Sequence, residues 1–174
     1  MDEINEDVVF YWSGPFSQWQ RSLFELDGKT FKTAEQAMMY LKAVLFGDLD
    51  IAQKILQADD PGTQKALGRQ VRGFDEGVWE ANRVEIVHRV NLAKFDQNKG
   101  LRRKLFQTLG KDLVEASPVD IIWGIGLAAE VARVTPRDLW PGQNLLGKVL
   151  TEVRDILETR YPDEAASVQK ETLR

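Results

Sequence analysis

One short segment, "GKTFKTAEQAMMYLKA" (28–43), places a carboxylate where it could do chemistry at the start of a helix. Thr33 can cap this helix, and Gln36 stands three residues later, as in a capping box. Glu35 is therefore expected in the first turn, where it either complements the helix dipole or is presented as a catalytic carboxylate. Lys42 lies two turns further along the same face, so both side chains could point into one pocket. The alternative for Lys42 is a surface lysine whose stem covers apolar neighbours.

Three other segments combine an aromatic residue, small residues and a polar side chain: "SGPFSQW", "ASPVDIIWGIG" and "WPGQNLLG". Glycine lets the backbone approach a ligand closely, and tryptophan offers a flat apolar face to a sugar or a base. Polar side chains in these segments can orient a polyhydroxylated ligand. They are Ser17, Gln18, Asp120, Gln143 and Asn144.

Each of these residues also has a structural interpretation. Asp120 follows Pro118 and could cap a turn, while Asn144 precedes "LLGKVL" and could cap a helix. Trp123 could belong to the core. The "WGIG" motif lacks the third glycine of a dinucleotide-binding fingerprint, so that fold is not expected.

The amino-acid composition limits the kinds of functional site that the chain can form. The chain has 174 residues, 43% of them hydrophobic, which suits one domain with a real core. Its formal net charge of -4 argues against a wholly basic nucleic-acid-binding surface but is compatible with a local basic groove. The sequence contains no cysteine and one histidine, His88, so disulfides, thiol nucleophiles and most zinc sites are excluded.

Targeting signals are not apparent in the sequence. No apolar run is long enough to span a bilayer, and the acidic start "MDEINEDVV" differs from a signal or transit peptide. We therefore expect a cytoplasmic protein with no membrane partner.

The elements that must position these residues are mostly helical. Strands are expected at Val8–Trp12 and around a hairpin turn at Asp27-Gly28, and later β-like segments at 113–117 and 120–126. Between and after them, apolar periodicity and capping residues predict helices over 33–46, 48–57, 60–71, 75–95, 98–110 and 143–158. The fold class predicted is α+β, a mostly helical single domain with a small β-sheet. We assign residues 1–158 to this domain and 159–174 to a polar C-terminal tail.

Taken together and in this order, the motifs resemble those of the NADAR, or YbiA-like, family. The resemblance extends from about Val9 to Leu157. Gln36 departs from the family pattern, in which many members carry histidine after the glutamate. The motifs that carry the resemblance are "FYWSGPFSQW", "FELDGKTFKTAEQAMMYLKAVLFGD", "QKALGRQV", "GFDEGVW", "KFDQNKGLRRKLFQTLG", "LVEASPVDIIWGIG" and "WPGQNLLGKVLTEVRDIL".

The resemblance implies an N-glycosidase that acts on ribosylated or ADP-ribosylated compounds. One branch of the family hydrolyses phosphorylated intermediates of riboflavin biosynthesis and releases ribose 5-phosphate, and this is the function expected here. Another branch removes ADP-ribose from guanine in nucleic acid, which makes modified nucleic acid an alternative substrate. A non-catalytic sensor of ADP-ribose or a related nucleotide is a third interpretation. None of these requires a metal or another cofactor.

The resemblance also suggests roles for individual residues. Glu35 would stabilise the positive charge that develops at the anomeric carbon or activate water, and Asp120 would be a second acid/base or a ribose ligand. Lys42 or Lys94 could instead attack the opened sugar as an amine, if burial lowers its pKa. Arg69 and the Arg102–Lys104 cluster are the expected phosphate contacts. The residues expected to bind substrate are Ser17, Trp19, Arg69, Trp123, Gly124 and Asn144.

Overall fold

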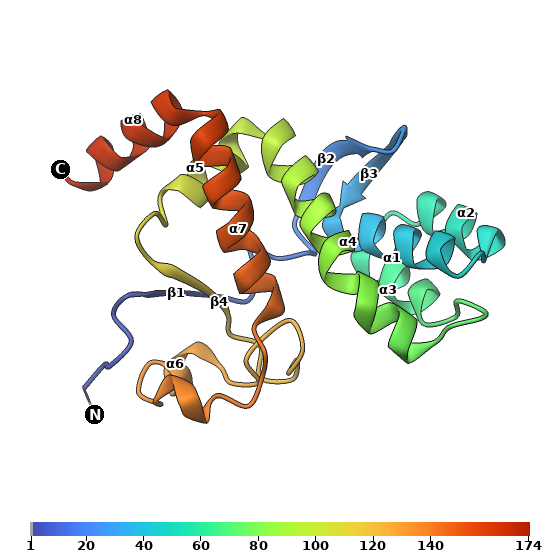
Figure 1. Ribbon diagram of the computed structural model, residues 1–174, viewed down its shortest axis with the longest axis horizontal. Coiled ribbons are helices and arrows are strands. Elements are labelled where there is room, and N and C mark those ends of the chain that lie inside the picture. Colours follow the sequence, from blue (N-terminus) through green and yellow to red (C-terminus); the bar gives the residue numbers. More distant parts are fainter. Residues whose placement is uncertain (1) are drawn as a thin grey trace. The chain divides into compact units, whose positions relative to one another are not determined.

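The computed structural model describes residues 2–174 as helices accompanied by two small sheets (Figure 1). The predicted α+β class, with helix predominant, is confirmed, and the β-structure consists of two two-stranded sheets. No helix in the described part of the chain is both long enough and apolar enough to cross a membrane. In chain order the elements are β1 (Val8–Tyr11), β2 (Arg21–Leu26), β3 (Lys29–Thr33), α1 (Ala34–Leu45), α2 (Leu49–Gln57), α3 (Pro61–Gly68), α4 (Glu76–Gln97), α5 (Lys99–Phe106), β4 (Asp112–Glu115), α6 (Ala129–Ala132), the 3₁₀ helix η1 (Arg137–Leu139), α7 (Leu145–Arg160) and α8 (Pro162–Thr172).

The chain divides into two compact units. The first comprises Lys99–Arg174 together with the N-terminal segment up to Ser17, and the second comprises Gln18–Asn98. We call them the terminal unit and the central unit.

The central unit begins with the predicted hairpin. Asp27 and Gly28 form a two-residue turn with φ of 51° and 74°, and Leu26 pairs with Lys29 across it. Positive φ at both central positions is the type I′ geometry that an Asp-Gly pair favours, because it matches the twist of the two strands. Phe24 and Phe31 then face one another on the buried side of the hairpin, with ring centroids 5.8 Å apart.

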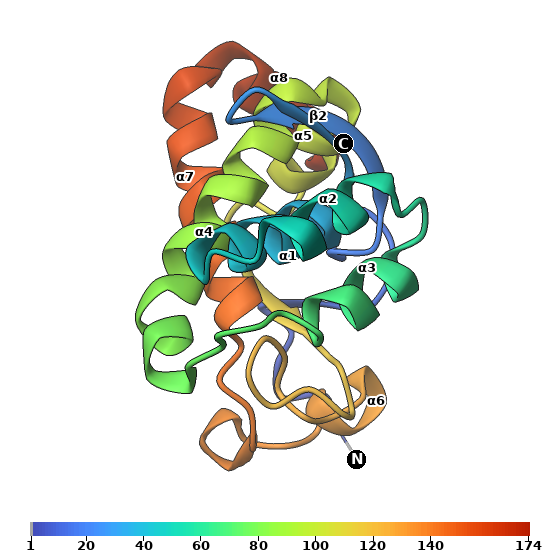
Figure 2. The ribbon, with the colours of Figure 1, turned by 90° about the vertical axis from the view of Figure 1, so that its right-hand side faces the viewer.

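Helix α1 is the central element of this unit and packs against α2, α3 and α4 (Figure 2). The predicted cap is confirmed, since the Thr33 hydroxyl accepts a hydrogen bond from the Gln36 backbone amide at 3.0 Å. The Gln36 side chain bonds the Lys32 amide, at 2.7 Å, and not the amide of Thr33 itself. Its Nε2 also donates to carbonyls at the end of α2, including that of Ile55 at 3.0 Å. Gln36 therefore joins β3, α1 and α2.

In the terminal unit, β1 and β4 pair in parallel and α7 packs on β4 (Figure 1). Gly147 permits the close approach of α7, because a Cβ at this position would lie 2.1 Å from the Leu113 carbonyl oxygen. Val8, Val114, Ile125 and Ala132 form a small apolar core in this unit. The sheet thus joins the start of the chain to its last third.

Residues 120–126 do not form the β-structure that the sequence predicts. Backbone amides of residues 142–146 donate to the carbonyls of residues 121–125, so this segment is a loop held by a distant part of the chain. Two of these donors, the amides of Leu145 and Leu146, belong to the first turn of α7, where amides have no partner within their own helix. The β-branched residues of this segment favour a strand. The prediction was wrong because the sequence does not reveal the hydrogen-bond partners at 142–146.

The last residues of the chain form α8, which packs on α5 and α7. Ala165 and Val168 are buried, and Glu164 receives two hydrogen bonds from Arg102, at 2.8 and 2.9 Å. The domain boundary at residue 158 stays a prediction.

Candidate active site

The site residues expected from the sequence divide between the two units. That the two sets meet in one cleft stays a prediction, and each is described within its own unit. The central unit contains Trp19, Glu35, Lys42, Arg69 and Lys94, and the terminal unit contains Ser17, Asp120, Trp123, Gly124 and Asn144.

Glu35 lies in the first turn of α1, as expected, and is only 7% exposed. Its backbone amide donates to the Gln18 carbonyl at 3.0 Å, which fixes the loop before β2 to the start of the helix. Because Thr33 already caps the helix, Glu35 is not required for that purpose. An acid that only complements a helix dipole is usually solvated, so the burial of Glu35 favours a more specific role.

Lys42 is half-buried on the same helix and belongs to a charged cluster with Glu35. Burial lowers its pKa, while the charges of Glu35 and Glu76 raise it and that of Arg69 lowers it further. The Lys42 ammonium also lies 4.8 Å from the centre of the Phe74 ring. The predicted proximity of Glu35 and Lys42 is thus consistent with the electrostatics of the central unit.

Lys94 on α4 is fully buried, with no exposed side-chain surface. Desolvation lowers its pKa to about 7, so a large fraction of the amine is neutral at neutral pH. A neutral amine is the nucleophilic form of lysine. Trp19 and Arg69, the other expected residues of this unit, are both exposed.

In the terminal unit, Asp120 caps the turn that carries Trp123. Its Oδ1 accepts hydrogen bonds from the backbone amides of Ile122 and Trp123, at 2.8 and 2.9 Å. The structural interpretation of Asp120 is therefore confirmed, and its role toward a ligand stays a prediction. Gly124 is required for close packing, because a Cβ there would lie 2.9 Å from the Glu115 carbonyl oxygen.

Asn144 precedes α7 but does not cap it with its side chain. Its Oδ1 accepts from the Glu115 amide, and its Nδ2 donates to the Leu113 carbonyl, both at 3.0 Å. The side chain therefore ties α7 to β4, and its φ of 53° places it in the left-handed region that asparagine tolerates. Ser17, also expected to bind substrate, is buried.

The basic cluster at Arg102–Lys104 is largely engaged within the terminal unit. Arg102 is 5% exposed, pairs with Glu164, and stacks its guanidinium 3.9 Å from the centre of the Tyr161 ring. Arg103 forms an ion pair with Glu171. These contacts hold α8, so we do not retain the hypothesis that Arg102 and Arg103 contact phosphate.

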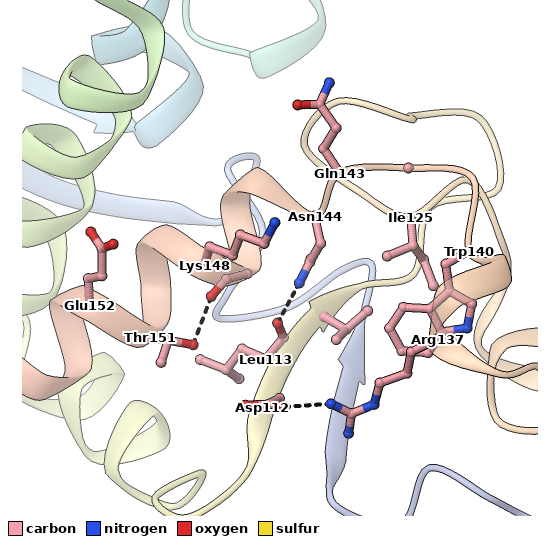
Figure 3. A pocket seen from close by; sticks show the side chains of 13 residues that line it. Asp112, Leu113, Ile125, Arg137, Trp140, Gln143, Asn144, Lys148, Thr151 and Glu152 are labelled. Atoms are coloured by element: carbon pink, nitrogen blue, oxygen red, sulfur yellow. Dashed lines mark hydrogen bonds and ion pairs between the residues drawn. The ribbon is translucent and has the colours of Figure 1, made fainter.

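A cavity of about 510 Å³ lies between β4, α7 and the loop before α7 in the terminal unit (Figure 3). Among the polar residues that the sequence singles out, Gln143 and Asn144 line it. Trp140, Arg137 and Lys148 also line it. Trp140 and Lys148 belong to the motif "WPGQNLLGKVLTEVRDIL", whereas Arg137 lies in none of the motifs. Arg137 is neutralised there by Asp7 and Asp112. The cavity alone therefore does not locate the chemistry.

Residues 2–174 contain no cluster of three acidic or histidine side chains that could hold a metal ion.

Comparison with protein-family models gives a match to the NADAR domain over residues 9–158. The chain is 46% identical over 145 residues to "N-glycosidase R617" of Acanthamoeba polyphaga mimivirus, an alignment covering 80% of this chain and 85% of the relative. It is 36% identical over 120 residues to "Riboflavin biosynthesis protein PYRR, chloroplastic" of Zea mays, covering 67% of this chain but only 18% of that protein.

Among solved structures, the solution structure of YbiA from Escherichia coli matches with a TM-score of 0.73 and 25% sequence identity. The match covers 90% of this chain and 88% of YbiA. The resemblance inferred from the sequence motifs is confirmed by the family model, the relatives and this structure.

Proposed function

The chain belongs to the NADAR family and is an N-glycosidase, and on that premise we propose which bond it cleaves and which residues act. The substrate is a small ribosylated compound, and the bond hydrolysed is the ribosyl C–N bond of a phosphorylated intermediate of riboflavin biosynthesis. The products are ribose 5-phosphate and the free amino-pyrimidine. The name of the Zea mays relative supports this substrate class, although the chain corresponds to a small part of that protein.

Glu35 carries the proposal. Cleavage of a ribosyl C–N bond builds positive charge on the anomeric carbon and the ring oxygen, and a carboxylate stabilises that charge or activates water. A buried carboxylate acts more strongly than a solvated one, because water screens it less. Glu35 is 7% exposed, and its backbone amide donates a hydrogen bond to the Gln18 carbonyl, which holds it at the start of α1.

Lysine chemistry offers a second route at the same carbon. The neutral amine of Lys42 or Lys94 attacks the anomeric carbon, the base leaves, and the ring opens to an iminium that water hydrolyses. Burial lowers the pKa of both lysines, which favours the neutral amine. The charges of Glu35 and Glu76 oppose that lowering at Lys42. By its pKa, Lys94 is therefore the better nucleophile, whereas the Lys42 side chain is more accessible to a substrate.

The remaining expected residues bind substrate in this proposal. Trp123 and Trp19 stack on the base or the ribose, while Asp120 Oδ2 accepts a ribose hydroxyl. Arg69, which is exposed and acts electrostatically on Lys42, contacts the 5-phosphate. Ser17, Gly124 and Asn144 shape the walls of the site.

We expect Glu35→Gln to lower the rate of hydrolysis by about 10²–10⁴-fold, because it removes a positioned charge while preserving shape. The measurement is release of ribose 5-phosphate from the ribosylated amino-pyrimidine, with the melting temperature recorded alongside. Glu80→Gln is a matched control, since it changes an exposed acid of α4 in the same unit. Full activity in Glu35→Gln, or equal losses in both variants, would refute the assignment.

The same assay separates the substrates and the two routes. Guanine carrying ADP-ribose, supplied in nucleic acid, tests the alternative substrate by release of ADP-ribose. Borohydride added during turnover reduces an iminium to a stable amine, so mass spectrometry of the trapped protein identifies Lys42 or Lys94. Turnover without any trapped adduct assigns the reaction to the carboxylate route. Failure of the wild-type protein to hydrolyse either substrate, with retained binding, would make it a sensor and contradict the proposal.

A further inference from the structure

Three buried or partly buried glutamines surround the start of α1, and only one of them lacks protein partners. The Gln36 amide bonds to Lys32 and to carbonyls of the α2 end. The Gln64 amide accepts from the Thr33 hydroxyl at 2.5 Å and donates to the Ala58 carbonyl at 2.8 Å. These two glutamines therefore have clear structural roles.

Gln18 differs from both. Its Oε1 and Nε2 are buried, yet neither has a hydrogen-bond partner among the described residues. A buried amide without partners is costly, and native proteins rarely retain one without a reason. The Gln18 backbone is fixed by contrast, because its carbonyl accepts the Glu35 amide at 3.0 Å.

We propose that the Gln18 carboxamide is a specificity-determining contact for the ribose hydroxyl next to the anomeric carbon. The inference rests on the proposed function, in which Glu35 faces that carbon. The Gln18 carbonyl accepts the Glu35 backbone amide, so the two residues are joined at their backbones. In this proposal, the Gln18 carboxamide reaches the sugar carbon next to the one that Glu35 faces. A hydroxyl donates and accepts, and two adjacent hydroxyls match the acceptor Oε1 and the donor Nε2 of one amide.

The two proposed substrates indicate that Gln18 contacts the ribose and not the base. The base differs between an amino-pyrimidine and guanine, whereas the ribose hydroxyls are common to both. An amide with one donor and one acceptor would recognise that shared part, and the protein would discriminate against 2-deoxyribosyl compounds.

The test measures binding of ribose 5-phosphate and 2-deoxyribose 5-phosphate to the wild-type protein and to Gln18→Met. We expect the wild-type protein to bind ribose 5-phosphate about 10-fold more tightly, which corresponds to one or two hydrogen bonds. Gln18→Met should bind both sugar phosphates equally and weakly. The effect of the substitution and the effect of removing the sugar hydroxyl are then not additive. Gln70→Met is the matched control, since Gln70 is exposed in the same unit, and it should leave the preference intact.

Stability provides a second measurement. Gln18→Met should not lower the melting temperature, because it removes two buried groups without partners, whereas Gln64→Met should lower it. If Gln18→Met lowers the affinity for both sugar phosphates by the same factor, the preference for ribose is preserved and the inference is overturned. If the variant fails to fold, the wild-type preference between the two sugars still decides, since no preference refutes a hydroxyl contact. Hydrolysis that proceeds without that preference leaves the proposed function standing and the Gln18 assignment refuted, whereas absence of hydrolysis and of binding refutes both.

Discussion

At the scale of single residues, burial distinguishes functional from structural interpretations. Asp120 and Asn144 are expected to bind substrate, which stays a prediction, and their hydrogen bonds show that both organise the backbone of the terminal unit. Glu35 and Lys94 are buried ionisable groups in the central unit, which is the pattern that active sites often show. A buried lysine is also a measurable thermodynamic burden on the folded protein.

Lys94→Met should raise the free energy of unfolding by an amount that depends on pH. The pKa of Lys94 is lowered from 10.5 to about 7, so the unfolded chain binds the proton more tightly. The folded state is therefore penalised most below pH 7, and the penalty disappears as pH rises toward 10.5. Each pKa unit corresponds to ~1.4 kcal/mol, so a gain of a few kcal/mol is expected at pH 7 and little at pH 10.

The measurement is the free energy of unfolding by urea at several pH values for both proteins. Lys104→Met, which alters an exposed lysine, provides the control. A stability difference that does not change with pH would show that desolvation of Lys94 is not its source.

At the scale of elements, close backbone approach fixes how α7 packs on β4. The contact occurs at Gly147, where a Cβ would lie 2.1 Å from the Leu113 carbonyl oxygen, a backbone atom that cannot move aside easily. Asn144, one turn earlier, bonds to the backbone of the same strand. The two residues act together to set the position of the helix.

Gly147→Ala should therefore destabilise the protein by about 1–3 kcal/mol, despite the better helix propensity of alanine. Gly100→Ala is the matched control, because Gly100 also lies in a helix and a Cβ there meets nothing within 4 Å. That variant should be neutral or more stable by up to ~1 kcal/mol. Thermal unfolding of both variants gives the comparison, and equal effects would exclude the proposed clash.

How far the sequence predicted these elements depends on the range of the interactions involved. The Asp27-Gly28 turn, the Thr33 cap and the start of the helix predicted over 60–71 were predicted because each depends on neighbours in the sequence. The loop at 120–126 was predicted wrongly because its backbone partners lie at 142–146. The bonds of Asn144 to β4 were missed for the same reason.

The candidate site shows the same division. Motifs identified Glu35, Lys42 and Lys94, but burial and the resulting pKa shifts required coordinates. The sequence does not show that the Gln18 amide lacks hydrogen-bond partners among the described residues while Gln36 and Gln64 have them.

At the scale of the whole molecule, the fold extends beyond the region that the family model matches. That match ends at residue 158, while α7 continues to Arg160 and α8 follows. Arg102 is nearly buried and depends on Glu164 of α8 for its charge partner. The pKa of the Glu164 carboxylate is lowered, chiefly because of its hydrogen bonds with Arg102.

A chain ending at Arg160 should lose several kcal/mol of stability, because the buried Arg102 would lose its ion pair with Glu164 and the apolar face of α8 would be lost. Chemical denaturation compares this shortened chain with the full one. Glu171→Gln removes only the exposed pair with Arg103 and should cost at most ~1 kcal/mol. Unchanged stability of the shortened chain would show that α8 is dispensable and that the fold closes near residue 158.

The loop that carries Trp123 has one further consequence. Carbonyls of residues 121–125 receive the amides of residues 142–146, and two of those amides start α7. The backbone that carries Trp123 cannot move outward as an independent flap, since such a movement would break hydrogen bonds of the first turn of α7. In the proposed site, a ligand would therefore meet a preformed loop at Trp123, and adaptation to bases of different size would come from other residues.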